Sequence, residues 1–514
     1  MSLLHGFTTW LVRLAIPLVL AYFVLTRPRI RRDGKPLRKP PNTLPLVGNG
    51  LLFIQARHKL FSWFVKCERQ FGRETFQITV PTLPPGIVIN DPRNVEYVFK
   101  NEGIFSKGDF VKGMLWDLFG YGIINADGEI WQIQRKAGKD FLNVPNLRVL
   151  TDTALPKYLS ASVDFLKDEK DDAVVDLQVV FHEITSLLMG KMAYNMEMHA
   201  DDAFTKAFDE ASGASTERFQ NPLWFITEVF TGANFRKQLA IVKDFGNRIV
   251  ASAVEDRKAG KCHAFASGEG EDSKLDEVSG SLIQSLLDTV PDQNMVADAA
   301  LNYLSAGRDT VAQALTWTFY RLMREPAVVE KLRKEAEQVI AAADSPPSSG
   351  LNSTIFNSTN MPYTMATFYE ALRLYPPIPF EIRQAERDTT LPDGTFLPKT
   401  SIIVWSLWAM GRSQSTWGSD ADDFKPERWL DGNDRLIQRG SGEFPVFNGG
   451  PRMCLGKKMA EVIAVQCIAS LVWMFDFAPV DDRERVTKTS LTLPMEGGLP
   501  CYARNRAGGL VVSA

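Results

Sequence analysis

The sequence contains few cysteines and few histidines, five of each in 514 residues. The cysteines are widely scattered and form no C-x-x-C pair. This pattern excludes a disulfide framework and a cysteine-ligated zinc site, and it is typical of a reducing compartment. The histidines form no H-x-x-x-H pair or cluster, so we expect none of them to bind a metal.

A strong excess of charge of one sign is also absent. The formal net charge of −3 predicts no nucleic-acid partner, because such proteins usually carry strongly basic patches. The apolar fraction of 45% and the charged fraction of 23% are typical of a globular protein with a substantial core. No second linker or internal repeat follows residue 50, so we predict one large domain over residues 51–514.

Residues 1–26 are predicted to form a membrane anchor. The run from Phe7 to Thr26 is mostly apolar, and its length of about 20 residues is enough to cross a bilayer core of about 30 Å as a helix. Arg13 lies off its centre and can extend toward the interface. No Lys or Arg precedes the run and no small-x-small site is evident, which argues against a cleaved signal peptide.

The next segment, residues 27–50, is basic and rich in proline, which is typical of a stiff hinge. Its positive charges should stay on the cytoplasmic side of the membrane. We therefore expect a single-pass protein that contacts lipid through one helix and places its large domain in the cytoplasm.

The hydrophobic pattern of the large domain is dominated by helices. Residues 295–323 form a long helical run ended by Pro326, and residues 365–374 form a shorter one stopped by Pro376. Residues 401–405 resemble a strand, and residues 491–512 resemble hairpins. The predicted fold class is mainly α with small β sheets.

The segment from Phe447 to Gly456 is the most informative part of the chain. It holds one cysteine, Cys454, in a glycine-rich bend before a helix-like run over residues 457–475. Glycines allow the backbone to approach a flat cofactor closely, and the start of a helix stabilises a thiolate. A lone thiolate is the iron ligand of some haem enzymes. The alternative is a buried structural cysteine beside a turn.

A second motif lies inside the long helix, at Ala306-Gly307-Arg308-Asp309-Thr310. Gly307 costs about 1 kcal/mol relative to alanine in a helix. Thr310 can bond back to a helix carbonyl. Together these residues predict a locally widened turn, and Asp309 and Thr310 form an acid–alcohol pair suited to relaying protons.

Two further pairs have helical spacing. Trp131 and Arg135 stand four apart, and both can donate hydrogen bonds to an anionic group. Glu370 and Arg373 stand three apart on one helix face, and Arg428 can complete a charged cluster with them. Such charges persist in a protein interior only when they are paired.

In this order and spacing the motifs resemble those of the cytochrome P-450 family over essentially the whole chain. The resemblance implies a P-450 fold preceded by one transmembrane helix, haem b as cofactor, and Cys454 as the iron ligand. It implies that the following residues bind the haem: Trp131, Arg135, Arg383, Phe447, Gly450, Arg452 and Gly456. It also implies that Glu370, Arg373 and Arg428 form a structural lock behind the haem. One departure is Trp429, where Phe is commoner, an exchange expected to matter little.

The resemblance further implies a monooxygenase of the endoplasmic reticulum membrane, with Asp309 and Thr310 as catalytic residues. Its electrons would come from an NADPH-dependent reductase, with a small haem protein as a further donor. The alternatives are a haem-thiolate hydroperoxide isomerase or dehydratase and a non-catalytic anchored haem- or lipid-binding protein. The Asp309–Thr310 pair argues against the first, and the complete set of motifs argues against the second.

The variant from Ala306 to Thr310 is similar to that of plant and fungal branches that hydroxylate fatty acids or alkanes near the chain end. A long aliphatic substrate is therefore predicted, with a fungal polyketide or terpenoid as the alternative. Lys107 or Lys112 is either a partner for a substrate carboxylate or simply solvated. The predicted apolar pocket lining consists of Leu304, Ala306, Ile378, Phe380 and Leu493.

Overall fold

The computed structural model of the protein describes residues 29–45, 47–80, 83–221, 223–259, 275–276, 278–342 and 355–506. The predicted membrane anchor over residues 1–26 lies outside these ranges. Within them, every helix is too short or too polar to span a lipid bilayer.

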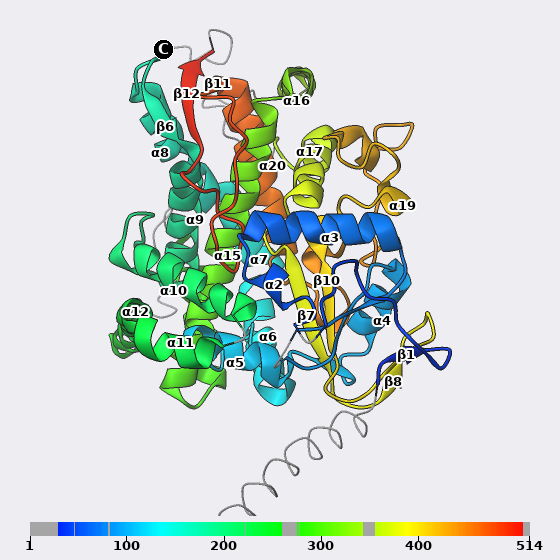
Figure 1. Cartoon of the computed structure of the whole chain (residues 1–514). Coiled ribbons are helices and arrows are strands. Elements are labelled where there is room, and N and C mark those ends of the chain that lie inside the picture. The colour runs from blue at the N-terminus through cyan, green and yellow to red at the C-terminus, as the bar shows by residue number, and fades with distance from the viewer. Residues whose placement is uncertain are drawn as a thin grey trace, which may run out of the picture.

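Helices form most of the described chain, as the sequence predicted. The sheets that contain β1 and β10 lie on one side of them, and the sheet of β6, β11 and β12 lies at the opposite end of the molecule (Figure 1). The helices are α2 (Gly50–Phe53), α3 (Arg57–Phe71), α4 (Pro92–Lys100), α5 (Gly108–Phe119), α6 (Gly128–Phe141), α7 (Val144–Val149), the π-helical turn η1 (Leu150–Ala154), α8 (Leu155–Asp168), α9 (Leu177–Tyr194), α10 (Ala203–Gln220), α11 (Trp224–Thr231), α12 (Ala233–Lys258), α14 (Ser281–Thr289), α15 (Gln293–Leu322), α16 (Pro326–Ala341), α17 (Pro362–Leu374), α18 (Leu407–Met410), α19 (Gln414–Trp417), the 3-10 turns η2 (Pro426–Trp429), η3 (Pro445–Phe447) and η4 (Gly450–Arg452), and α20 (Lys457–Met474).

Three sheets accompany the helices, with strand orders β2-β1-β9-β8, β3-β4-β10-β7-β5 and β11-β12-β6. The strands are β1 (Arg31–Arg32), β2 (Lys35–Pro36), β3 (Phe76–Ile78), β4 (Gly86–Val88), β5 (Phe105–Ser106), β6 (Val174–Asp176), β7 (Phe380–Ala385), β8 (Thr389–Thr390), β9 (Thr395–Leu397), β10 (Ile402–Ser406), β11 (Phe475–Pro479) and β12 (Pro500–Asn505).

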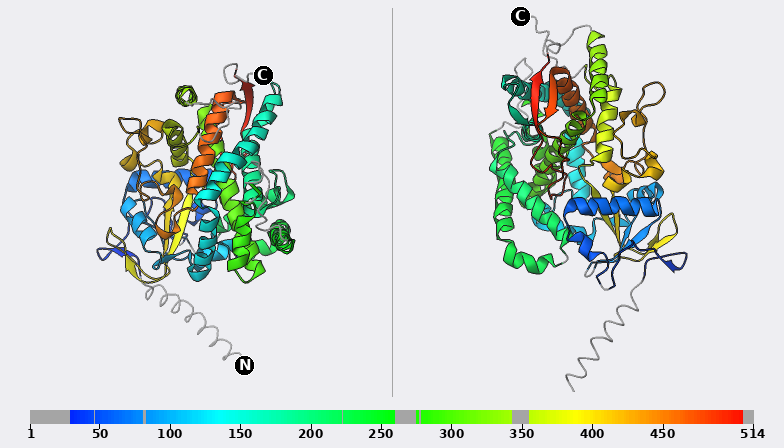
Figure 2. Two further views of the ribbon diagram at one scale, coloured as in Figure 1. Left: turned by 180° about the vertical axis from the view of Figure 1, so that it is seen from behind. Right: turned by 45° about the horizontal axis from the view of Figure 1, so that its top comes forward.

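The long helix α15 runs through the helical part of the molecule and lies against α9, α12, α17 and α20 (Figures 1 and 2). Asp292 caps its start by accepting a hydrogen bond from the backbone N–H of Asn294. Most of its side chains are buried, which explains why its hydrophobic pattern has no polar face. The helix predicted over residues 295–323 is thereby confirmed within two residues at each end.

Helix α15 runs without interruption from Gln293 to Leu322, and the widened turn expected around Gly307 stays a prediction. Gly307 has another reason to be there. A Cβ atom at this position would lie 2.5 Å from the sulfur of Met189 on α9. Gly307 therefore allows α9 and α15 to pack closely.

The strand predicted over residues 401–405 corresponds to β10, which lies inside the five-stranded sheet. It pairs in parallel with β4 and antiparallel with β7, where Val404 faces Ile382. The described part of the segment predicted as hairpins, residues 491–512, contains no complete hairpin, although an isolated antiparallel bridge joins Met495 to Thr487, just before it. There β12 pairs with β11 and β6, which lie outside it.

The segment predicted as a hinge is part of the folded body in its described residues. Strand β1 pairs with β9, and Ile30 and Leu37 are buried in the apolar cluster of the neighbouring sheet. Arg32 forms an ion pair with Glu74, 2.6 Å between nitrogen and oxygen. The folded body therefore begins before residue 50, where the sequence analysis placed its boundary.

Candidate functional site

A cavity of about 530 Å³ lies between α15 and the loop that carries Cys454. Its wall also includes residues of α3, α5, α6, α10 and β7, together with residues 491–492. Apolar side chains form most of this wall, among them Phe64, Phe110, Val111, Leu115 and Val404. The cavity thus brings together segments from nearly the whole described chain.

The loop from Phe447 to Gly456 is a compact series of turns that presents Cys454 to the cavity. The backbone N–H of Cys454 donates a hydrogen bond of 2.8 Å to the carbonyl of Phe447. Gly450 has φ +59°, and a Cβ atom there would lie 2.2 Å from the carbonyl oxygen of Phe99. Only glycine fits this bend, although Gly450 itself does not line the cavity. Phe447 and Gly456, by contrast, both do.

Helix α20 starts at Lys457, directly after this loop, as the sequence predicted. Burial raises the pKa of the Cys454 thiol above its ordinary value. The backbone N–H groups of Gly456 and Lys457 and the charge of Arg135 act in the opposite direction but do not outweigh burial. The N–H groups at the helix start thus favour the thiolate, as expected, and a metal cation bound at the sulfur would stabilise it further.

Trp131 and Arg135 on α6 both reach the cavity, which confirms that they share one face. Arg135 donates a hydrogen bond of 2.9 Å to the carbonyl of Met453, next to the cysteine. The Trp131 ring packs against two guanidinium groups, whose carbons lie 5.4 Å (Arg135) and 4.3 Å (Arg452) from its centre. Two guanidinium groups therefore lie beside the Trp131 ring on this side of the cavity.

Arg452 and Arg383, both predicted to bind an anionic cofactor group, line the cavity but already have acidic partners. Arg452 contacts Glu102 at 2.7 Å and Asp127 at 2.6 Å. Arg383 contacts Glu381 at 2.6 Å. Each would have to share its charge with these partners when it binds a further anion.

Glu381 is a residue that the sequence analysis did not identify. Burial alone would raise its pKa, but the cations Lys107 and Arg383 and the amide of Asn448 lower the pKa of Glu381 to about 2. The Asn448 amide donates to it at 3.1 Å, so Glu381 ties β7 to the cysteine loop. Its position two residues before Arg383 on one strand was the available signal, since such residues share a face.

Neither lysine considered for a substrate carboxylate is unpaired. Lys107 lies 3.5 Å from Glu381, and Lys112 lies 2.7 Å from Asp127. Their positive charges are therefore compensated by the protein.

Asp309 and Thr310 both line the cavity from α15. The Thr310 hydroxyl donates a hydrogen bond of 2.7 Å to the carbonyl of Ala306, as predicted for a back-bonded threonine. Asp309 is almost fully buried, and burial raises its pKa to about 6 although the adjacent Arg308 cation lowers it. The acid–alcohol pair is thus in place, with a carboxyl group that can change its protonation state near neutral pH.

A buried cluster that the sequence did not reveal surrounds Asp309. The Nε of Arg308 lies 2.8 Å from Oδ1 of Asp309, and its Nη1 donates to the Thr205 hydroxyl at 3.1 Å. Asp209, whose side chain is half exposed, lies 3.6 Å from the same guanidinium. His182 lies 4.0 Å from Asp309, and burial lowers the pKa of His182 to about 3. Arg308 thus holds Asp309 in place between the cavity and a carboxylate at the surface.

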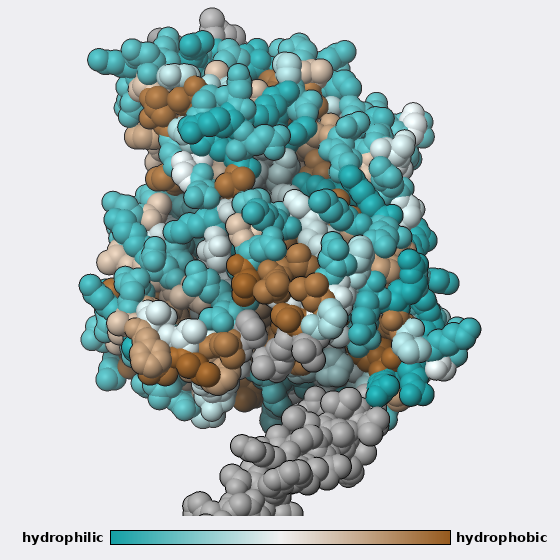
Figure 3. Space-filling view, viewed as in Figure 1, coloured by the Kyte–Doolittle hydropathy of each residue, from teal (hydrophilic) through white to brown (hydrophobic). Residues whose placement is uncertain are grey.

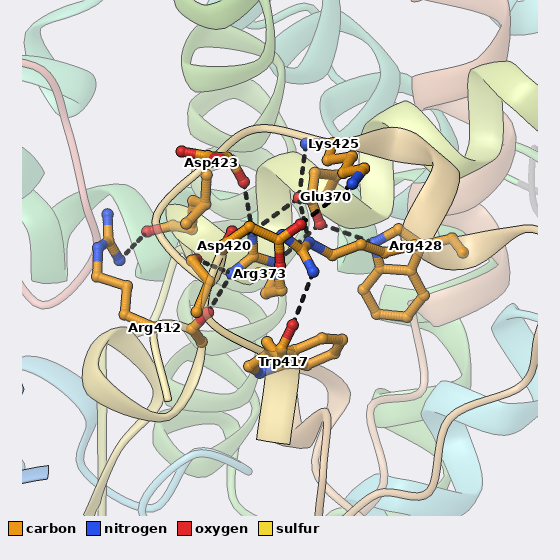
Figure 4. Close-up of polar contacts among 12 residues, drawn as sticks. Glu370, Arg373, Arg412, Trp417, Asp420, Asp423, Lys425 and Arg428 are labelled. Atoms are coloured by element: carbon orange, nitrogen blue, oxygen red, sulfur yellow. Dashed lines mark hydrogen bonds and ion pairs between the residues drawn. The ribbon is translucent and has the colours of Figure 1, made fainter. Parts of the chain in front are cut away.

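Glu370, Arg373 and Arg428 form the charged cluster that the sequence predicted (Figure 4). Two nitrogens of Arg373 contact the two oxygens of Glu370, at 2.7 and 2.8 Å. Arg428 lies 3.3 Å from Glu370 and 2.8 Å from Asp420. Arg373 also donates to the backbone carbonyls of Gly411, Ala421 and Asp423. One helix, α17, is thereby bonded to the loop that leads toward the cysteine segment.

The role expected for Trp429 needs correction. Its indole N–H donates a hydrogen bond of 3.0 Å to Oε2 of Glu370, a contact that Phe cannot make. Trp429 therefore belongs to the cluster, and exchanging it for Phe has a cost that the sequence analysis did not expect.

We predict that Trp429→Phe lowers the free energy of unfolding by about 1–3 kcal/mol, since a buried carboxylate loses a hydrogen-bond donor. The measurement is the urea midpoint of the full-length protein at unchanged slope. Trp417→Phe is the matched control, because the indole of Trp417 donates to a neutral carbonyl, that of Met410, at 3.0 Å. A loss at position 429 no larger than the loss at position 417 would contradict the prediction.

The predicted pocket residues divide into two groups. Ala306, Ile378 and Phe380 line the cavity. Leu304 and Leu493 do not, and both are fully buried in the core. Leu304 stands two residues from Ala306 and so points to another side of the helix. Leu493 lies in the segment held by the Trp317 indole, which donates to its carbonyl at 2.8 Å.

Comparisons with known proteins agree with this geometry. The protein-family model described as Cytochrome P450 matches residues 38–501. The chain is 29% identical to cytochrome P450 86B1 of Arabidopsis thaliana, over 96% of this chain and 90% of the relative. It is 28% identical to cytochrome P450 94A1 of Vicia sativa, over 91% of this chain and 90% of the relative. It is 30% identical to the cytochrome P450 monooxygenase cyp1 of Mycosarcoma maydis, over 87% of this chain and 71% of the relative.

Proposed function

Because the chain belongs to the cytochrome P450 family and is a haem-thiolate monooxygenase, we propose that it hydroxylates a long aliphatic chain, a fatty acid or an alkane, at or near its end. The observation that carries the proposal is the shared cavity: its mostly apolar wall includes Cys454, Asp309 and Thr310. The resemblance of the segment from Ala306 to Thr310 to that of aliphatic hydroxylases supports the same substrate class.

The residues of the cavity fit the haem iron cofactor of this family, which we propose is haem b. Cys454 offers a sulfur at the cavity wall, and Arg135 offers a guanidinium beside it that has no acidic partner within ion-pair distance among the described residues. Trp131 packs against two guanidinium groups, and its indole N–H would be a further donor for an anionic group of the cofactor. When bound, the haem iron would supply the activation of dioxygen.

The protein's own residues would orient the substrate, exclude water and move protons. The apolar wall binds an aliphatic chain by removing it from water, at roughly 25 cal/mol per Å² of apolar surface. The Asp309 carboxyl group would release its proton toward the cavity, and the Thr310 hydroxyl would position the acceptor of that proton. Arg308 would keep the Asp309 carboxyl group in place through the contact at 2.8 Å.

We predict that product formation falls as the pH rises through about 6. The sign follows from the raised pKa of Asp309: below about 6 the carboxyl group holds a proton to donate, and above it the protonated fraction falls tenfold per pH unit. The measurement is product formed per NADPH consumed, from about pH 5 to about pH 8, a range that brackets this pKa. Asp309→Asn should lower the yield and remove the inflection.

Asp288→Asn serves as the control for this experiment, because Asp288 is an exposed carboxylate paired with Arg257. It should keep the wild-type profile. An unchanged inflection in the Asp309→Asn protein would contradict the assigned role of Asp309.

We also propose that the enzyme lies on the endoplasmic reticulum membrane, with its catalytic domain in the cytoplasm and an NADPH-dependent reductase as its electron donor. Exposed apolar side chains on α2 and α11 support membrane contact, among them Leu51, Val229 and Phe230, which is 81% exposed. Figure 3 shows apolar areas over both helices on one face of the molecule. A lipid surface would remove these side chains from water.

The substrate class can be tested with microsomes that contain the full-length protein and its reductase. They are incubated with fatty acids, alkanes, terpenoids and polyketides, and the products are identified by mass spectrometry. Hydroxylation of aliphatic chains at or near the end, dependent on NADPH, is the expected result. Oxidation of compact polycyclic compounds alone would overturn the aliphatic substrate and favour tailoring of a secondary metabolite. Turnover of hydroperoxides without NADPH would overturn the monooxygenase reaction.

A further inference from the structure

The wall of the cavity contains a buried arginine that the functions assigned above do not use. Arg57, the first residue of α3, is 7% exposed and lines the cavity. Its Nη1 donates to the backbone carbonyl of Ser490, and its guanidinium carbon lies 5.3 Å from the centre of the Phe61 ring. The structure gives its remaining N–H groups no acceptor among the described residues.

No carboxylate of the described chain compensates the charge of Arg57. Burial is the cause that lowers the pKa of Arg57 to about 10, and no acidic neighbour counteracts it. The first turn of α3 also contains no acidic residue, so the positive end of the helix dipole adds to the charge. A buried cation without an anionic partner is costly, and the cost falls when an anion binds.

Comparison with the other cations of the cavity singles out Arg57. Arg383, Arg452 and Lys107 each have an acidic partner. Arg135 has no acidic partner within ion-pair distance in the described part of the chain. It contacts the carbonyl of Met453 beside Cys454, and we assign it to the cofactor. Arg57 instead contacts Ser490, away from the cysteine loop in the chain.

Polar side chains of α10 accompany Arg57 in the cavity wall. Ser212, Thr216 and Gln220 stand four residues apart on one face of this helix, and all three line the cavity. The Ser212 hydroxyl lies 2.9 Å from that of Ser490, whose carbonyl holds Arg57. A polar region thus interrupts a wall that is otherwise mostly apolar.

We propose that Arg57 binds the carboxylate of the substrate, so that the enzyme acts on free fatty acids in preference to neutral chains. This inference rests on the proposed aliphatic hydroxylation and narrows its substrate class. A guanidinium and a carboxylate form strong paired hydrogen bonds when water is excluded. Fixing the carboxylate at Arg57 would extend the alkyl chain along the apolar wall, with its far end free to reach the reacting centre.

The test compares palmitic acid, methyl palmitate, hexadecan-1-ol and hexadecane as ligands of the full-length holoenzyme in detergent. Binding is measured by titration calorimetry, and products are identified in the reconstituted system with reductase. We expect palmitic acid to bind more tightly than the three neutral ligands. Arg57→Met should weaken binding of the acid about 10- to 100-fold and leave the neutral ligands nearly unchanged.

Two further variants make the result specific. Arg57→Lys keeps the charge and should restore part of the preference for the acid. Lys59→Met removes an exposed cation from the same helix and should behave as the wild type. If Arg57→Met does not fold, the wild-type comparison of acid with methyl ester still decides the question.

Equal affinity of the wild type for palmitic acid and methyl palmitate, with both hydroxylated, would overturn the role of Arg57 and leave the proposed aliphatic hydroxylation intact. If Arg57→Met weakens the binding of all four ligands equally, the role of Arg57 is likewise overturned and the proposed aliphatic hydroxylation stands. Failure of every aliphatic ligand to bind or react, in an enzyme that oxidises polycyclic compounds, would overturn the proposed function itself.

Discussion

Cys454→Ser should abolish hydroxylation and eliminate the red-shifted absorption that the reduced protein shows with carbon monoxide when a thiolate binds its iron. The reason is chemical: a serine oxygen does not supply the electron density of a thiolate. The loop should keep its conformation, because its hydrogen bond to the carbonyl of Phe447 is donated by the backbone N–H of residue 454 and not by the side chain. Product formation should fall to background, while the circular dichroism spectrum stays unchanged.

Cys467→Ser is the matched control for this variant. Cys467 lies on α20 and is fully buried, but it does not line the cavity. Its replacement should lower stability modestly, because it places a hydroxyl group in an apolar core. The carbon monoxide spectrum should remain that of the wild type. Normal activity in the Cys454→Ser protein, or an equal loss of activity in the control, would contradict the assignment of Cys454 as the iron ligand.

Arg373→Met should prevent the protein from retaining haem. Arg373 is buried, pairs with Glu370 and donates to three backbone carbonyls. Removing one partner of a buried ion pair costs about 3–5 kcal/mol. Without Arg373, Glu370 would keep only Arg428 as a cationic partner, at 3.3 Å. Total stabilities are only about 5–15 kcal/mol, so this loss is a large fraction. The measurement is the molar ratio of haem to purified protein, together with the urea midpoint.

Arg69→Met tests whether loss of any nearby ion pair has the same effect. Arg69 is exposed and pairs with Asp422, in the loop that also bonds to Arg373. Exposed pairs contribute only about 0–1 kcal/mol, so this variant should bind haem normally. A full haem content and an unchanged midpoint in Arg373→Met would show that the cluster does not stabilise the haem-binding fold.

The elements that were predicted well are those whose signal is local. Helix α15 has a long apolar pattern and a proline after its end, and α20 follows a glycine-rich loop. The predicted ends of both helices therefore lie within two residues of the observed ends. The clustering of Glu370 with Arg373 depends only on helical spacing, and the structure confirms it. Trp131 and Arg135 share a face for the same reason.

What the sequence did not reveal depends on contacts between distant segments. Arg57 is buried and donates a hydrogen bond to the carbonyl of Ser490, far along the chain, and no local pattern indicates this contact. For Glu381 the local signal was only its spacing from Arg383 on β7, while its partners Lys107 and Asn448 come from two other segments. Replacing Trp429 by Phe looked conservative because the sequence does not show the hydrogen bond from the Trp429 indole to Glu370.

The sulfur–iron bond at Cys454 is the central claim, and the most direct test is the absorption spectrum of the purified, full-length wild-type protein after reduction and exposure to carbon monoxide. We predict the long-wavelength band of a thiolate-ligated haem, at full intensity relative to the haem content. A band at the shorter wavelength typical of nitrogen-ligated haem, in a folded and haem-loaded protein, would contradict it.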